Sequence, residues 1–319
     1  MVSADRTKGV PSPAHPQQRR QPLPDHRPKP TEEDPRAPRA LQAIRESPTY
    51  RLAEQDADFI ARPDIRGPRL EIEYLKADVI LAEQQVDHTI VVYGSTRIPE
   101  PAAARRNVEA LRALARSNLE NDEAVLRLAA AERILAKSRY YDVAREFGRL
   151  VGEADRSAGS SRLVIMTGGG PGLMEAANRG AFDVGAKSVG LNIELPHEQY
   201  PNPYVTPDLC FRFHYFALRK LHLLLRAKAL VAFPGGYGTF DELFEVLTLV
   251  QTRKIKPIPV ILVGEQFWRR AVDFDYLVEE GVIDLEDREL FWFAETAQDI
   301  WNGILAWYAA AGEPLDVGR

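Results

Sequence analysis

Two glycine-rich turns hold the residue types best suited to bind an anion. The first runs from Gly168 to Gly170, and the second runs from Gly235 to Thr239. Each follows a short apolar run that reads as a buried strand and precedes a segment with helical spacing. A strand that ends in glycines and opens a helix leaves unpaired N–H groups at the positive end of the helix dipole. The pair of turns therefore predicts a phosphate-bearing ligand held from two sides.

Neither turn matches a standard phosphate motif. The dinucleotide fingerprint needs a third glycine where this chain has Leu173, and no Gly-Lys-Ser/Thr follows either turn, as a Walker A motif requires. A single Gly-Gly-Gly-Pro-Gly also fits a tight connection between a strand and a helix, because glycine is favoured wherever φ is positive. The expectation of a ligand thus depends on the two turns together.

Three charged residues next to these turns have two interpretations each. Thr239 and Glu242 have the spacing of a capping box, which gives Glu242 a structural role, but a carboxylate beside a phosphate turn is also placed to do chemistry. Arg219 and Lys220 fall near the start of a predicted helix, where cations oppose the dipole. We favour a functional role for Arg219, whereas Lys220 fits a solvated helix face equally well.

The elements that must position these residues alternate between strands and helices. The apolar runs predict strands over 89–93, 162–166, 188–193, 209–213, 229–233, 259–263 and 291–294. Helical spacing predicts helices over 70–81, 101–119, 122–151, 173–184, 216–226, 240–251, 267–280 and 297–310, and leaves open a break near Lys137. The pattern indicates an α/β fold, a Rossmann-like doubly wound parallel sheet with helices on both faces. Both glycine turns and Gly94-Ser95 would then lie at the carboxyl ends of strands, where such folds bind ligands.

Composition sets the remaining limits. Residues 1–41 are rich in Pro and Arg and poor in aliphatic residues, so we expect a disordered tail followed by a single domain over 42–319 with a helical insertion at 102–151. The formal charge of −5 and the pI near 5.8 give no reason to expect nucleic acid as a partner. Cys210 is the single cysteine, and no apolar stretch approaches the length of a membrane span. We expect a cytoplasmic protein with no membrane partner.

The second turn with its flanking residues, from Pro234 to Glu242, resembles the Pro-Gly-Gly-x-Gly-Thr-x-x-Glu signature of the LOG-type phosphoribohydrolases. These enzymes cleave cytokinin riboside 5′-monophosphates and are often mislabelled lysine decarboxylases. The Gly-Gly-Gly-Pro-Gly-Leu-Met turn, the Arg219-Lys220 pair and the strand end at Tyr93-Gly94-Ser95 agree with the resemblance. It covers roughly Ile90 to Trp307.

The resemblance implies a role for individual residues. Glu242 and Arg219 match the catalytic glutamate and arginine of the family. Ser95 matches a serine beside the nucleotide, Met174 matches a methionine where the base packs, and Lys220 joins the substrate-binding set. The residues of the two turns that match the phosphate and ribose loops are Gly168, Gly169, Gly170, Gly235, Gly236, Tyr237, Gly238 and Thr239. No metal and no organic cofactor is implied, and the small-molecule partner is a nucleotide.

The implied reaction is hydrolysis of the N-glycosidic bond of a purine nucleoside 5′-monophosphate to free base and ribose 5-phosphate, with N6-substituted adenine nucleotides as the leading substrate. A general nucleoside monophosphate nucleosidase and a non-catalytic nucleotide sensor are the alternatives. The long helical insertion and the segment 190–199 resemble the longer bacterial members, whose substrates are less settled. Glu194, His197 and Glu198 could line the base pocket or form an ordinary charged loop. The family also implies a homodimer or a dimer-based hexamer.

Overall fold

The computed structural model describes residues 13–23, 27–117, 122–157, 163–196, 200–313 and 315. The chain divides into two compact units, Met1–Gly67 and Pro68–Arg319. The first unit contains helices α1 (Ala37–Glu46) and α2 (Ala57–Ile60), together with short 3-10 helices at Pro48–Tyr50, Ala53–Gln55 and Pro63–Ile65. Helix α1 begins inside the segment 1–41 that composition assigns to a tail, and the disorder of that tail stays a prediction.

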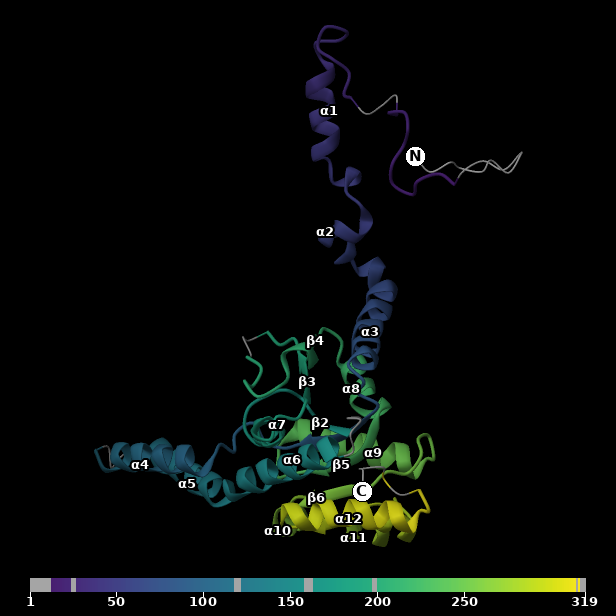
Figure 1. Ribbon diagram of the computed structural model, residues 1–319. Helices are drawn as coiled ribbons and strands as arrows, with labels where there is room; N and C mark the ends of the chain where they lie inside the picture. The colour runs from purple at the N-terminus through teal and green to yellow at the C-terminus, as the bar shows by residue number, and fades with distance from the viewer. Residues whose placement is uncertain are drawn as a thin grey trace. The chain divides into compact units, whose positions relative to one another are not determined.

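The second unit is built on a parallel sheet whose seven strands lie in the order β4-β3-β2-β1-β5-β6-β7 (Figure 1). The strands are β1 (His88–Tyr93), β2 (Leu163–Thr167), β3 (Ser188–Ile193), β4 (Cys210–Phe213), β5 (Ala227–Ala232), β6 (Val260–Val263) and β7 (Trp292–Ala294). Each lies within two residues of its predicted range, except that Arg162 falls outside the described residues. All neighbouring pairs are parallel, so the predicted α/β class is confirmed.

Two apolar clusters cover the two faces of the sheet. Along β1, Ile90 and Val92 belong to one cluster, and Val91 and Tyr93 belong to the other, because successive side chains in a strand point to opposite faces. The first cluster includes residues of α6 (Arg139–Ser157), α7 (Leu173–Asp183) and α12 (Ala297–Ala310). The second includes residues of α3 (Arg66–Glu83), α8 (Phe216–Leu225), α9 (Tyr237–Gln251), α10 (Glu265–Ala271) and α11 (Phe274–Glu279). The sheet is therefore doubly wound, as predicted.

The predicted helices need four corrections. The insertion holds three helices, α4 (Pro101–Ser117), α5 (Asp122–Lys137) and α6, and the break that the sequence left open falls at Ser138. The segment 267–280 forms α10 and α11 instead of one helix, because the Asp273 side chain accepts a hydrogen bond from Tyr276 N at 3.0 Å and caps the second helix. Helix α9 begins three residues before its predicted start. Helix α3 runs from Arg66 to Glu83 and so extends beyond its predicted range at both ends.

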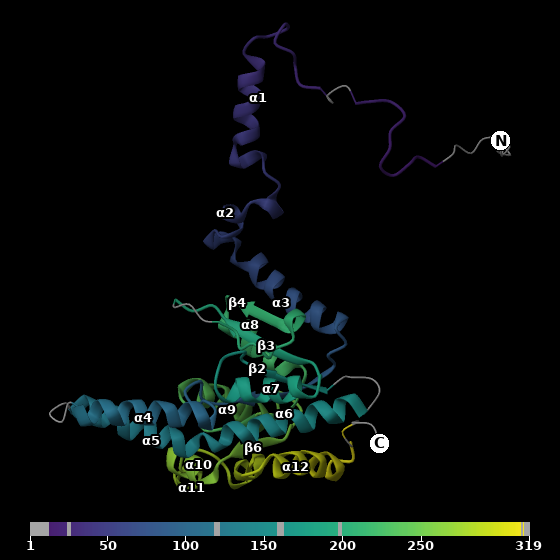
Figure 2. The ribbon, with the colours of Figure 1, turned by 60° about the vertical axis from the view of Figure 1, so that its left-hand side comes forward.

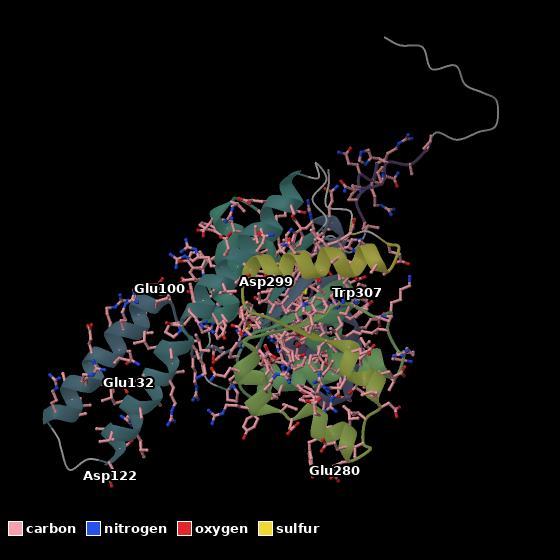
Figure 3. The ribbon with its side chains drawn as sticks, turned by 90° about the horizontal axis from the view of Figure 1, so that it is seen from below. Glu100, Asp122, Glu132, Glu280, Asp299 and Trp307 are labelled. Atoms are coloured by element: carbon pink, nitrogen blue, oxygen red, sulfur yellow. The ribbon has the colours of Figure 1, made fainter. Side chains whose placement is uncertain are left out.

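Helices α4 and α5 run side by side and project from the sheet as a hairpin (Figure 2). Glu100 lies near the base of this hairpin and Asp122 lies at its tip (Figure 3). In the part of the chain that the structure describes, no helix combines the length and the apolar composition needed to cross a membrane.

The order of the strands fixes where a ligand would bind. The chain leaves β1 toward β2 on one side and leaves β5 toward β6 on the other, although β1 and β5 are neighbours. Loops that diverge in this way open a crevice at the carboxyl ends of the two strands. The residues that follow β1 are Gly94 and Ser95, and those that follow β5 lead into the second glycine turn.

Candidate active site

A pocket of about 1020 Å³ opens at this crevice between β1 and β5. Its wall contains the residues after β1, the start of α7, residues of α8, the start of α9 and one face of α5. Of the residues predicted from the sequence, the pocket wall includes Ser95, Met174, Arg219, Gly235, Gly236, Tyr237, Gly238, Thr239 and Glu242. Segments far apart in the sequence thus meet in one pocket.

The second glycine turn forms the entrance to helix α9. Gly236 is the N-cap, so the helix begins at Tyr237 and Glu242 is its sixth residue. The capping-box interpretation of Thr239 and Glu242 is therefore wrong, because Gly236 has no side chain that could cap the helix. A Cβ added at Gly236 or Gly238 would meet no atom within 4 Å. The backbone at the N-terminal end of α9 is therefore not covered by side chains at Gly236 and Gly238. An anion site at a helix N-terminus requires such open space.

Glu242 and Arg219 form a buried ion pair on the pocket wall. The Arg219 Nη1 to Glu242 Oε1 distance is 3.5 Å, and the two side chains are 11% and 7% exposed. Arg219 Nε also donates to the carbonyl oxygen of Leu191 at 2.7 Å, which anchors the guanidinium to β3. Burial raises the pKa of Glu242 to about 7, and the neighbouring cations Arg219 and Lys220 reduce this rise. The carboxyl group therefore changes its charge near neutral pH.

The first glycine turn supports this pair from behind. Gly168, Gly169 and Gly170 are buried and lie off the pocket wall. A Cβ at Gly168 would lie 2.5 Å from Arg219 Nη2 and 3.1 Å from Met174 Sδ, so only glycine lets the guanidinium approach this closely. Gly169 has a φ of +71°, which L-residues rarely adopt.

A buried hydrogen-bond network fixes the shape of this turn. Thr167 Oγ1 donates to Asn178 Oδ1 at 2.8 Å and accepts from Gly169 N at 2.9 Å. Asn202 Nδ2 donates to the Gly170 carbonyl at 3.1 Å and to Asn178 Oδ1 at 3.0 Å. Hydrogen bonds between buried polar groups make a structure rigid when every group has a partner. This network therefore holds the glycine turn in a fixed shape beside Arg219. No local sequence pattern points to Asn202, which lies far from the turn along the chain.

The strand end after β1 contacts the start of α7. Leu173 N, in the first residue of α7, donates to the Ser95 carbonyl at 3.2 Å, and Ser95 Oγ accepts from Arg97 N at 3.1 Å. Met174 follows on the pocket wall with its side chain 9% exposed. Ser95 and Met174 therefore both lie on the pocket wall. These are the residues that the family resemblance places beside a nucleotide.

Lys220 differs from the other predicted residues in its surroundings. Its Nζ forms ion pairs with Asp241 Oδ2 at 3.0 Å and with Glu245 Oε2 at 3.1 Å. Lys220 does not line the pocket. Its two ion pairs connect α8 to α9. Tyr237 is 97% exposed at the pocket mouth and packs against little of its own unit.

The charged loop after β3 contributes one described residue. Glu194 forms an ion pair with Arg212 at 3.2 Å and a hydrogen bond with His214 Nδ1 at 2.9 Å, and it does not line the pocket. His197 and Glu198 lie outside the described residues.

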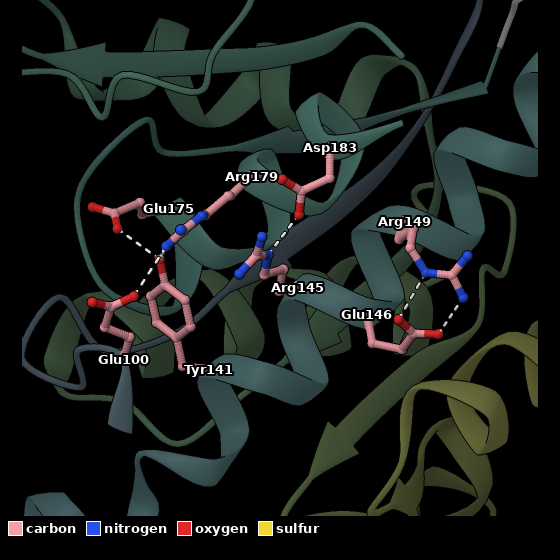
Figure 4. A network of polar contacts seen from close by, with 8 residues as sticks. All are labelled: Glu100, Tyr141, Arg145, Glu146, Arg149, Glu175, Arg179 and Asp183. Atoms are coloured by element: carbon pink, nitrogen blue, oxygen red, sulfur yellow. Dashed lines mark hydrogen bonds and ion pairs between the residues drawn. The ribbon is translucent and has the colours of Figure 1, made fainter. Parts of the chain in front are cut away.

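A second set of ion pairs joins α6, α7 and the residue before α4 (Figure 4). Tyr141 donates to Glu175 Oε1 at 2.7 Å, and Arg179 Nη1 donates to Glu100 Oε2 at 3.1 Å. Glu175, next to Met174 in the chain, is thus held by Tyr141. This network connects the base of the α4–α5 hairpin to the helix that carries Met174.

Sequence reasoning missed several residues of the pocket wall. Tyr93 has a buried hydroxyl with no hydrogen-bond partner in the described ranges, and burial together with the nearby Glu242 carboxylate raises its pKa. Further residues of the wall that were missed include Arg97, Arg133, Lys137, Phe216 and Phe267. The sequence shows only that Arg133 and Lys137 have the spacing of one helix face. This spacing does not show which part of the protein that face packs against. Across the described ranges, no three His, Cys, Asp or Glu side chains are grouped to hold a metal ion.

Known proteins similar to this chain agree on one family. The family model described as "Possible lysine decarboxylase" matches residues 174–304. A cytokinin riboside 5′-monophosphate phosphoribohydrolase of Arabidopsis thaliana is 31% identical over 170 residues, which cover 51% of this chain and 74% of the relative. A probable enzyme of the same name from Oryza sativa subsp. japonica is 28% identical over 149 residues, which cover 44% and 67%. For two further rice relatives, the matched residues span 60% and 56% of the relative's length.

Among solved structures, the molybdenum cofactor carrier protein of Chlamydomonas reinhardtii matches with a TM-score of 0.40 and 16% identity, over 70% of this chain and 99% of that chain. A TM-score this low carries no conclusion about function. The identity and coverage of the Arabidopsis thaliana relative identify the family. This chain belongs to the LOG family of cytokinin riboside 5′-monophosphate phosphoribohydrolases.

Proposed function

We propose that this protein hydrolyses the N-glycosidic bond of a purine nucleoside 5′-monophosphate and releases the free base and ribose 5-phosphate. The observation that carries the proposal is the buried Glu242 carboxyl, 3.5 Å from the Arg219 guanidinium, in a pocket beside the open N-terminus of α9. The relatives are named as phosphoribohydrolases, which supports the same class of reaction.

Glu242 is the proposed general base. Cleavage of the bond between C1′ and the base nitrogen leaves its electron pair on the base and develops positive charge on the ribose ring. A deprotonated carboxylate stabilises that charge and accepts a proton from the water that attacks C1′, and this proton then passes to the nitrogen of the departing base, which leaves as the neutral free base. The raised pKa of about 7 suits this role, because a base works best when its pKa lies near the working pH.

Arg219 is the proposed partner that orients Glu242. Its guanidinium has donors directed at both Leu191 and Glu242, so it can fix the carboxylate while keeping further N–H groups for the ligand. The glycines at 168–170 would assist by leaving room for the guanidinium.

The N-terminus of α9 is the proposed site of the 5′-phosphate. Residues Gly235 to Gly238 offer backbone N–H groups at the positive end of a fifteen-residue helix, and Gly236 and Gly238 leave space for an anion. Met174 and Phe216 supply apolar surface on the same wall, which suits a purine. N6-substituted adenine is the proposed base.

We also propose a cytoplasmic homodimer, in which α8 contributes to the interface. Phe216, Leu221 and Leu225 on this helix are 52%, 43% and 46% exposed. Exposed apolar residues on one helix favour burial against a second copy.

The test is chromatography of products after incubation with a panel of nucleoside 5′-monophosphates that includes isopentenyladenosine monophosphate and AMP. The wild-type chain should release free base and ribose 5-phosphate, and Glu242→Gln should release neither above the uncatalysed rate. Tight AMP binding without release from any nucleotide would contradict hydrolysis and would indicate a nucleotide sensor.

A further inference from the structure

Tyr93 lies on the pocket wall, on the face of the sheet that α8 and α9 cover. It is the last residue of β1 and lines the pocket. Its side chain belongs to the same apolar cluster as Leu223 of α8 and Leu243 of α9. Because successive side chains of a strand point to opposite faces, the Tyr93 ring points toward the two helices that carry Arg219 and Glu242.

The hydroxyl group of Tyr93 is buried and unpaired. The residue is 3% exposed, and its hydroxyl oxygen has no hydrogen-bond partner among the residues that the structure describes. By contrast, the hydroxyl of the buried Tyr308 donates to the Lys228 carbonyl at 2.7 Å. Buried polar groups are nearly always paired, so an unpaired hydroxyl on a pocket wall indicates a role in that site.

The Glu242 carboxyl is the charged group with the largest effect on this hydroxyl. Burial raises the pKa of Tyr93, and Glu242 raises it further through its negative charge and its capacity to accept a hydrogen bond. Arg219 acts in the opposite direction, and Glu245 adds a smaller rise. The hydroxyl therefore keeps its proton near neutral pH and is available as a donor.

The Glu242 carboxylate has room for a second donor. Its Oε1 atom lies 3.5 Å from Arg219 Nη1, which is long for a hydrogen bond, and the two oxygens of a carboxylate accept about four bonds. Lys220, the other cation that affects Glu242, is engaged by Asp241 at 3.0 Å and by Glu245 at 3.1 Å. The other cations on the pocket wall are Arg97, Arg133 and Lys137. A neutral donor from β1 would complete the contacts that α8 makes.

We infer that Tyr93 is a positioning residue whose hydroxyl donates a hydrogen bond to the ionised Glu242 carboxylate. Arg219 then holds the carboxylate from α8, and Tyr93 holds it from β1. A hydrogen bond to an ionised acceptor is stronger than one to a neutral acceptor, so the hydroxyl favours the ionised form and opposes the effect of burial. The inference rests on the proposed function for the role of Glu242 as the base, but the hydrogen bond itself can be tested without turnover.

The experiment measures the pH at which Glu242 ionises, with and without the Tyr93 hydroxyl. The full chain is unfolded in urea at intervals up to about pH 9, as wild type, Glu242→Gln, Tyr93→Phe and the double variant. The difference between each chain and its Glu242→Gln counterpart reports the titration of Glu242. We expect a midpoint near pH 7 in the wild type and about one pH unit higher in Tyr93→Phe, which is a tenfold change in the ionisation equilibrium.

The same shift should appear in catalysis. When the midpoint moves from about pH 7 to about pH 8, the ionised fraction of Glu242 at pH 7 falls from about one half to about one tenth. The kcat/KM of Tyr93→Phe should therefore be about fivefold below the wild type at pH 7 and should recover toward it near pH 9. A tyrosine that only packs the core would lower stability at every pH and leave the midpoint in place.

Tyr308→Phe is the matched control. It removes the hydroxyl of another buried tyrosine, which does not line the pocket, and it should leave the Glu242 midpoint unchanged. If Tyr93→Phe fails to fold, NMR of the chain with carbon-13-labelled tyrosine replaces it. One tyrosine resonance should shift with a midpoint near pH 7 in the wild type and stay fixed in Glu242→Gln.

An unchanged midpoint in Tyr93→Phe, an equal shift in Tyr308→Phe, or no tyrosine resonance that depends on Glu242 would overturn the inference. A shifted midpoint with no turnover of any nucleotide would remove the proposed function and keep the hydrogen bond. Turnover with an unchanged midpoint would do the reverse.

Discussion

Replacement of Glu242 by glutamine should change how the stability of the protein depends on pH. The carboxyl has a pKa of about 7 in the folded chain, against an ordinary value of 4.5. The folded state therefore binds this proton more tightly than the unfolded state, and between these two pH values folding is favoured by acid. The stabilisation is complete below pH 4.5 and is lost as pH rises through about 7.

The magnitude follows from the two pKa values. At 1.36 kcal/mol for each pKa unit, the wild-type chain should lose about 3 kcal/mol of unfolding free energy between pH 4.5 and pH 8 relative to Glu242→Gln. All other titrating groups are common to both chains, so their contributions largely cancel in the difference. The loss arises because a charge is forced into a site only 7% exposed.

The assay is urea unfolding followed by circular dichroism, for both chains, at intervals from pH 4.5 to pH 8. The difference in unfolding free energy should grow in favour of the variant as pH rises. Parallel curves would refute the reasoning, because they would mean that Glu242 titrates at its ordinary pKa and is not held in a low-dielectric site. The same ionisation should appear in catalysis, as a rise in kcat/KM with a midpoint near pH 7.

Three further substitutions test separate parts of the site. Arg219→Lys should lower kcat about a hundredfold while leaving the fold intact, because an ammonium cannot contact Leu191 and Glu242 together; activity within tenfold of the wild type would argue against an orienting role. Asn202→Ala should lower the unfolding free energy by about 1–3 kcal/mol in urea titrations, since the Gly170 carbonyl loses its Asn202 donor and Asn178 Oδ1 keeps only Thr167, and an unchanged midpoint would contradict this. Leu225→Lys should shift the sedimentation coefficient from dimer to monomer, and an unshifted value would exclude α8 from the interface.

Much of the fold could be predicted from local patterns. The strands β1, β2 and β6 contain continuous apolar runs because both faces of the sheet are covered, and their positions could therefore be predicted to within two residues. Helix ends were less readable. The start of α9 at Tyr237 depends on a glycine N-cap, and the split between α10 and α11 depends on one aspartate cap.

The part of the candidate site that consists of motif residues could be predicted from the sequence. Gly235 to Thr239, Arg219 and Glu242 were all identified, because glycine turns at strand ends and charges beside them have few other uses. The role of Lys220 was not, since its ion pairs with Asp241 and Glu245 depend on how α8 packs on α9.

The sequence by itself determined the alternation of strands and helices and the residue types at the ends of β1, β2 and β5, because these depend on short-range periodicity and backbone freedom. Only the tertiary structure decided the charge state and the boundary of the site. The pKa of Glu242 follows from burial among residues of other elements, and Arg133 and Lys137 reach the pocket because the C-terminal half of α5 packs beside it. Burial and proximity between distant segments are properties of packing, and no local pattern encodes them.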